Sequence, residues 1–155
     1  MGGVAVRANR YGKAPDGPTA GMSFLDVDSR TVRAFALADL VAIVAFVLVG
    51  EYQHGMLAYT ATHPLRLLGV LAPFLVGWLV AAPLGRAYST RTHGPRGLVG
   101  WTVLSWLAAD ALGQALLGTG AFPIGYDPVF AVVVAVFGSL FLLITRGVAY
   151  AAVLR

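Results

Sequence analysis

The sequence contains no cysteine, a single lysine and only seven acidic residues among its 155 positions. Without cysteine there is no disulfide, no thiolate metal site and no cysteine nucleophile. Charged residues make up 12% of the chain and hydrophobic residues 58%, whereas a soluble domain usually carries about 25% charge. The scarcity of charge and a mean hydropathy of +0.77 exclude an ordinary soluble enzyme. They predict an integral membrane protein with one domain.

Four apolar segments are long enough, or nearly so, to cross a bilayer as helices of roughly 20 residues. We expect these helices at about residues 32–50, 65–85, 97–118 and 128–154. Proline opens two of them and glycine follows three of them, as is usual at helix ends: Pro64, Pro128, Gly50, Gly85 and Gly118. The sequence therefore predicts an all-α fold, a bundle of four transmembrane helices.

The chain is expected to have two parts, a disordered basic tail at residues 1–31 and the transmembrane domain at residues 32–155. Residues 1–21 are rich in glycine, proline and alanine and have no hydrophobic period, which is typical of disorder. Met22 is a second candidate for the initiator, and N-terminal sequencing of the native protein would distinguish it from Met1.

The basic residues give the expected orientation. Ten of the eleven lie in the tail, in the connection between the second and third segments, or near the C-terminus: Arg7, Arg10, Lys13, Arg30, Arg33, Arg86, Arg91, Arg96, Arg146 and Arg155. Only Arg66 lies in a connection on the other side. Because cytoplasmic loops are enriched in arginine and lysine, we expect both termini in the cytoplasm and the protein in the cell membrane. We interpret the net charge of +4 as part of this topology signal. We therefore expect no nucleic-acid partner.

Small residues recur every four positions in the second segment, at Gly69, Pro73, Gly77, Ala81 and Gly85. Transmembrane helices associate mainly by close approach at such residues and by buried polar contacts. This ridge is therefore expected to contact a neighbouring helix.

Asp39 and Asp110 lie well inside the first and third expected helices, at depths that differ by about 6–8 Å for a rise of 1.5 Å per residue. An acid inside a membrane helix is a functional hypothesis by default; the alternative is a hydrogen bond that only fixes packing. If their helices are neighbours, the two carboxyl groups could face one cavity or bracket one water cluster. Gln114, one turn from Asp110, is expected to donate to it, and the indole N–H of Trp106 is expected to reach it from the other side.

The two acids also suggest an internal repeat. The segment ALADL around Asp39 is similar to LAADAL around Asp110, and His63-Pro64 opens its helix much as Asp127-Pro128 does. In this hypothesis Arg86 and Arg146 end equivalent helices, and the two halves are related by an axis along the membrane normal.

Motifs for catalysis and cofactor binding are lacking. The three histidines lie in connections, where they are unsuited to hold haem between helices, and no zinc-protease, phosphate-loop or serine-hydrolase motif occurs. We therefore expect no enzyme activity, no cofactor and no metal.

The chain resembles a prokaryotic membrane family known as domain of unknown function 3054. The resemblance covers roughly residues 32–150 and is carried by three stretches: ADLVAIVAFVLVGEYQHG, APFLVGWLVAAPLGRAY and the turn Gly120-Ala121-Phe122-Pro123. It implies a small four-helix membrane protein, and it brings no activity, substrate or catalytic residue.

Two functions from different classes fit these observations. The first is a small transporter or channel component that handles protons or cations, with Asp39, Asp110, Gln114 and Trp106 as the candidate residues. The second is a non-catalytic accessory or assembly subunit whose small-residue faces dock a larger membrane complex. Because four helices enclose little volume, a pathway is expected to need a homo-oligomer or a larger complex.

Overall fold

The computed structural model describes residues 29–89 and 94–153, and they contain only helices, turns and irregular segments. The elements are α1 (Ser29–Gln53), α2 (Leu57–Thr62), α3 (Pro64–Leu84), α4 (Pro95–Leu117), α5 (Pro128–Val133), the π-helical turn η2 (Val134–Gly138) and α6 (Ser139–Val153). The all-α prediction is confirmed. The expected tail lies outside the described residues except for its last few positions, which already belong to α1.

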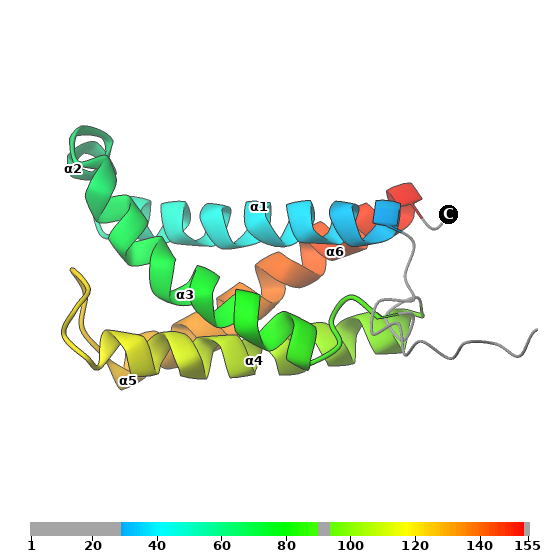
Figure 1. Cartoon of the computed structure of the whole chain (residues 1–155). Coiled ribbons are helices and arrows are strands. Elements are labelled where there is room, and N and C mark those ends of the chain that lie inside the picture. Colours follow the sequence, from blue (N-terminus) through cyan, green and yellow to red (C-terminus); the bar gives the residue numbers. More distant parts are fainter. Residues whose placement is uncertain (1–28, 90–93, 154–155) are drawn as a thin grey trace, which may run out of the picture.

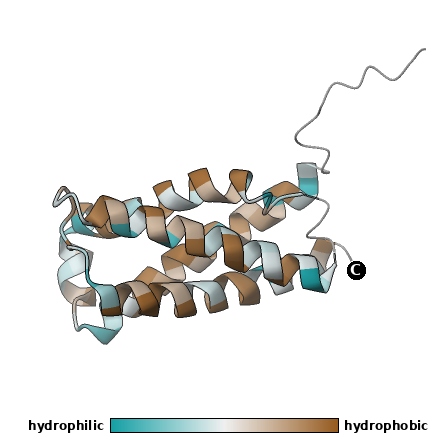
Figure 2. Ribbon diagram, turned by 90° about the horizontal axis from the view of Figure 1, so that it is seen from below, coloured by the Kyte–Doolittle hydropathy of each residue, from teal (hydrophilic) through white to brown (hydrophobic). Residues whose placement is uncertain are grey.

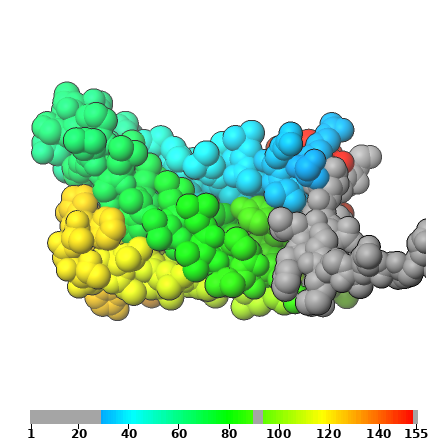
Figure 3. Space-filling model, in the orientation of Figure 1, coloured from blue at the N-terminus to red at the C-terminus, as the bar shows by residue number. Residues whose placement is uncertain are grey.

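Successive long helices run in opposite directions along the bundle (Figure 1). The start of α1, the end of α3, the start of α4 and the end of α6 lie together, and we call this the terminal end of the bundle. The short helix α2 and the connection from α4 to α5 lie at the opposite end, which we call the α2 end. On the face shown in Figure 3, α3 crosses diagonally between α1 and α4.

Among the described residues, three helices are long and apolar enough to cross a membrane: Ser29–Gln53, Pro64–Leu84 and the continuous stretch Pro128–Val153. The fourth expected span, α4, is not one of them, since Asp110 and Gln114 interrupt its apolar sequence. Figure 2 shows hydrophobic residues along the lengths of the helices and hydrophilic residues mainly toward the two ends. The count of four spans and the cytoplasmic termini stay predictions.

The small-residue ridge of α3 makes close contacts, mostly with α4. Gly77 lies so close to α4 that a methyl group there would overlap the backbone carbonyl of Ala109, and one at Gly85 would overlap the Ser105 hydroxyl. From the opposite side, Gly113 of α4 lies against Phe74. Gly69 contacts Pro123 in the connection from α4 to α5. Close backbone approach therefore holds α3 and α4 together, as the four-residue spacing predicts.

The π-turn η2 interrupts the last long helix where Trp106 of α4 packs against it. A π-turn frees backbone carbonyl groups from the α-helical pattern, and the indole of Trp106 donates to the Val134 carbonyl oxygen at 3.0 Å. Gly138 leaves room for the indole ring, because a Cβ there would overlap it. The N–H of the buried indole is therefore hydrogen-bonded within the protein.

Candidate functional site

The strongest polar contact inside the bundle joins α1 and α6. Arg146 donates from Nε to Asp39 Oδ1 at 2.6 Å and from Nη2 to Asp39 Oδ2 at 2.7 Å. The side chains are 0% and 1% exposed, respectively. Arg146 also donates from Nη1 to the Ala87 carbonyl oxygen at 2.9 Å and to Thr102 Oγ1 at 3.1 Å. A paired, hydrogen-bonded geometry of this kind is the strong form of ion pair.

Aromatic side chains enclose the pair. The guanidinium carbon of Arg146 lies 5.3 Å from the ring centre of Phe35, 5.4 Å from that of Trp78 and 5.1 Å from that of Tyr88, within the range of cation–π attraction. Tyr88 donates to Asp39 Oδ2 at 2.6 Å, and Trp78 Nε1 donates to the same oxygen at 3.3 Å. Burial raises the pKa of the Tyr88 hydroxyl well above its usual value, and the Asp39 charge raises it further. The hydroxyl therefore keeps its proton and remains a donor.

The contacts of Arg146 correct one prediction. Arg146 was counted among the basic residues that flank the membrane helices, and this is wrong for its side chain, which is fully buried beside Asp39. Asp39 and Arg146 neutralise each other's charge, and the guanidinium also donates to Ala87 and Thr102. The cluster is therefore a fixed link between α1, α3, α4 and α6. We call Asp39, Arg146, Tyr88, Trp78 and Thr102 the clamp.

A conservative change at Tyr88 tests the clamp. Tyr88→Phe keeps the ring over the guanidinium and removes the hydroxyl that donates to Asp39. We expect a loss of about 1.5–3 kcal/mol in the free energy of unfolding, the range for hydrogen bonds to charged groups. SDS unfolding in mixed micelles measures it, with Tyr126→Phe at an exposed position as the control. Equal stability of the two variants would contradict the role of the hydroxyl.

Asp110 has very different surroundings. Its Oδ1 accepts from Gln114 Nε2 at 3.0 Å, and each of the two side chains is 6% exposed. Within residues 29–89 and 94–153, Asp110 has no ion-pair partner, and Gln114 Oε1 is buried without any hydrogen-bond partner. The expected bond from Gln114 is therefore present. Among these residues, the Asp110 carboxylate therefore has no positive charge beside it, and the Gln114 amide oxygen has no hydrogen-bond donor.

Asp39 and Asp110 were expected to face one cavity, but the two acids share no hydrogen-bond partner among the described residues. Helices α1 and α4 each pack against α3 and α6, so the acids lie on helices that are separated by these two. Asp39 is bound within the clamp, whereas Asp110 is bound to Gln114. Trp106 does not complete the Asp110 site as expected, because its indole N–H is used on Val134. Its ring instead lies against Trp78, with the ring centres 5.9 Å apart.

The burial pattern supports the internal repeat. When Asp39 is aligned with Asp110, six of the eight buried positions of α1 coincide with buried positions of α4. These are Thr31, Phe35, Asp39, Ala42, Ile43 and Phe46 against Thr102, Trp106, Asp110, Gly113, Gln114 and Leu117. When Pro64 is aligned with Pro128, the buried residues Val70, Phe74, Trp78 and Ala82 coincide with Val134, Gly138, Leu142 and Arg146. The packing agrees, since α1 pairs extensively with α6 as α4 does with α3.

This alignment changes which residue of the first half matches Arg146. The internal repeat proposed from the sequence matches Arg146 with Arg86. However, Arg86 lies beyond the end of α3, where it is exposed and has a φ of 55°. The equivalent position is Ala82. Asp39 of α1 thus has an arginine on its partner helix α6. Asp110 of α4 has an alanine at the equivalent position of its partner helix α3.

The structure defines an all-helical bundle with three helices apolar enough to cross a membrane and a buried aspartate–arginine clamp. The chain belongs to the family described as protein of unknown function DUF3054, whose sequence model matches residues 36–149. The matched range includes Asp39, Asp110 and Arg146, and it confirms the resemblance found in the sequence. No curated protein and no solved structure matches the chain.

Proposed function

We propose that this protein is a small multi-pass membrane protein that handles a proton or a monovalent cation at the Asp110–Gln114 pair. In this proposal α4 is the fourth membrane span, and the clamp around Asp39 is the rigid part of the bundle. The proton- or cation-handling role therefore belongs to Asp110 and Gln114. Asp39 and Trp106 support the packing around them.

The observation that carries the proposal is the incomplete bonding of the pair. A buried acceptor without a donor is costly, and so is an ionised carboxylate in hydrocarbon without a countercharge. A proton on Asp110 would remove the charge and add a donor beside Gln114. A bound monovalent cation would achieve the same through the carboxylate and amide oxygens, which are the ligand types that hard cations prefer.

The internal repeat supports the same assignment. For Asp39, the acid of the first half, the guanidinium of Arg146 provides a permanent positive charge. For Asp110, the acid of the second half, the equivalent position on the partner helix α3 is Ala82, which offers no charge. A mobile cation or proton can therefore supply at Asp110 what the protein itself supplies at Asp39.

The charges at the helix ends support the orientation. Arg30, Arg33, Arg86 and Arg96 are all exposed and belong to the terminal end, whereas Arg66 belongs to the α2 end. Even without Arg146, this asymmetry favours a cytoplasmic terminal end. We therefore propose the cell membrane as the location, with the α2 end outside.

Reconstitution into vesicles tests the function. In liposomes that contain a trapped pH dye, we expect the wild type to dissipate a pH gradient or to take up ²²Na⁺, and the two assays separate a proton from a cation. Asp110→Asn should lower the active flux at least tenfold, because the amide cannot exchange a proton or balance a cation. Gln114→Leu should lower it as well.

The matched control is Gln53→Leu, the same change at an exposed position near the end of α1. Circular dichroism and gel filtration verify that each variant is folded. Full flux in a folded Asp110→Asn protein would overturn the proposal. So would a wild type that moves neither ion, and co-purification of a stoichiometric partner in mild detergent would then favour the accessory-subunit alternative.

A further inference from the structure

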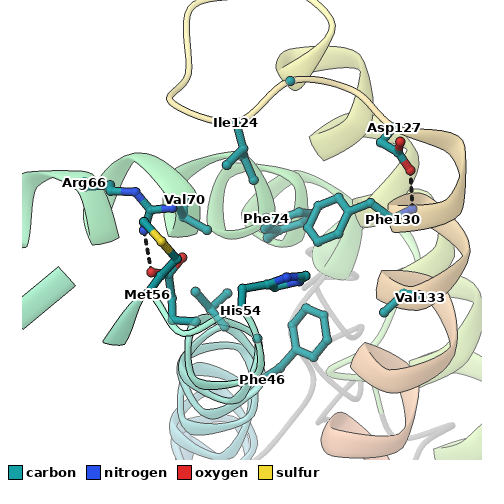
Figure 4. A pocket seen from close by; sticks show the side chains of 14 residues that line it. Phe46, His54, Met56, Arg66, Val70, Phe74, Ile124, Asp127, Phe130 and Val133 are labelled. Carbon is teal, nitrogen blue, oxygen red and sulfur yellow. Dashed lines mark hydrogen bonds and ion pairs between the residues drawn. The ribbon is translucent and has the colours of Figure 1, made fainter. Parts of the chain in front are cut away.

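A cavity of about 370 Å³ lies at the α2 end, between α1, α3, α5 and the connection that precedes α5 (Figure 4). None of the residues of the clamp or of the Asp110–Gln114 pair lines it. Its volume lies within the range of roughly 300–1,000 Å³ that is usual for small-molecule sites. The cavity is therefore a separate site.

The walls of the cavity are apolar and aromatic. Its apolar lining consists mainly of Phe46, Val47, Val70, Phe74, Phe130 and Val133. The rings of Phe74 and Phe130 meet edge to face, with their centres 6.0 Å apart. Such walls favour an apolar body with flat rings, and their π faces attract a positive charge.

One pair of charges at the rim cancels. Glu51 forms an ion pair with Arg66 and also accepts from the Thr60 hydroxyl. Arg66 Nη1 also donates to Thr60 Oγ1 at 3.1 Å, and the guanidinium lies over the Tyr59 ring. These contacts fix α1, α2 and α3 to one another. They leave no net charge on this side of the cavity.

Asp127 carries the remaining charge. Its Oδ1 accepts from the Phe130 backbone N–H at 2.8 Å as the N-cap of α5. In the described part of the chain, Asp127 forms no ion pair. The aromatic cavity therefore has at its rim one carboxylate that forms no ion pair with the described residues. His54, the remaining titratable side chain of the lining, is exposed.

We infer that this cavity binds a lipophilic organic cation. The apolar body of the ligand lies among the phenylalanine and valine side chains, and its positive charge lies near Asp127. The binding does not depend on the proposed role of Asp110, because the two sites share no residue.

Equilibrium binding of radiolabelled tetraphenylphosphonium to the purified full-length protein in dodecyl maltoside tests this inference. The assay is performed at pH 8. We expect saturable binding. Tetraphenylborate, which has the same shape and the opposite charge, should compete at least tenfold less well than unlabelled tetraphenylphosphonium.

Two variants examine the charge and the space separately. Asp127→Asn keeps a good N-cap and removes the charge, so we expect at least tenfold weaker binding. Val133→Trp fills the cavity and should abolish binding, whereas Val132→Trp, at the neighbouring position that does not line the cavity, should not change it. Asp110→Asn should also leave binding unchanged.

Equal affinity for the two tetraphenyl ions, or unaltered affinity in the folded Asp127→Asn variant, would overturn the charge assignment. Binding that survives Val133→Trp would place the ligand outside the cavity. Loss of ion flux in Asp110→Asn with intact tetraphenylphosphonium binding would keep the two proposals distinct.

Discussion

Replacing Arg146 with methionine should destabilise the protein by about 3–5 kcal/mol, the usual result when one partner of a buried ion pair is removed. Methionine fills much of the arginine's volume but leaves the Asp39 charge in an apolar interior. It also removes the donors to the Ala87 carbonyl and to Thr102. SDS unfolding in mixed micelles, followed by tryptophan fluorescence, measures this free energy of unfolding.

A double variant separates the missing charge from the missing volume. Arg146→Met combined with Asp39→Leu removes both charges, and replacement of a whole buried pair by apolar side chains is often neutral or stabilising. We therefore expect the double variant to recover most of the stability that the single variant loses. Arg33→Met, at an exposed position of α1, should stay within about 0.5 kcal/mol of the wild type. A stable single variant would show that the clamp does not hold the bundle together.

Local patterns in the sequence are enough to predict where the helices lie and which residue hydrogen-bonds to Asp110. The apolar runs between proline and glycine predict helices in the same parts of the chain in which the structure has α1, α3, α4 and the stretch from α5 to α6. The one-turn spacing of Asp110 and Gln114 predicts their hydrogen bond, which the structure contains. These features depend on neighbours within a few positions, so a single sequence reveals them.

The partner of Asp39 could not be predicted in the same way. Arg146 lies 107 positions away, and the two meet only because α1 packs against α6. Counting basic residues near helix ends treats Arg146 like every other flanking arginine. One signal was present, since the apolar sequence continues for several residues after Arg146. A single arginine inside such a run indicates a buried charge that needs an acid.

The role of Trp106 was missed for a related reason. Its position one turn before Asp110 places the acid on the same face of the helix, within reach of the indole. The carbonyl oxygen that it actually bonds belongs to Val134, on another helix. Only the three-dimensional packing shows that this acceptor exists.

The contact between α3 and α4 leads to the other large expected effect. Gly77→Ala places a methyl group where the Ala109 backbone carbonyl lies, and neither backbone can yield without moving a whole helix. Overpacking of this kind costs about 1–3 kcal/mol, here by separating α3 from α4. The same SDS unfolding experiment measures the loss.

Gly100→Ala is the matched control, because it makes the same change inside α4 at a position with nothing within 4 Å of the new Cβ. Alanine is a better helix former than glycine by up to about 1 kcal/mol, so this control should be neutral or slightly stabilising. The two variants should therefore shift stability in opposite directions, although both gain the same intrinsic helix propensity. If Gly77→Ala is as stable as Gly100→Ala, the helices are not in backbone contact there, and the close packing of α3 on α4 is wrong. If only Gly77→Ala unfolds more easily, the small-residue ridge holds the half of the bundle that contains Asp110.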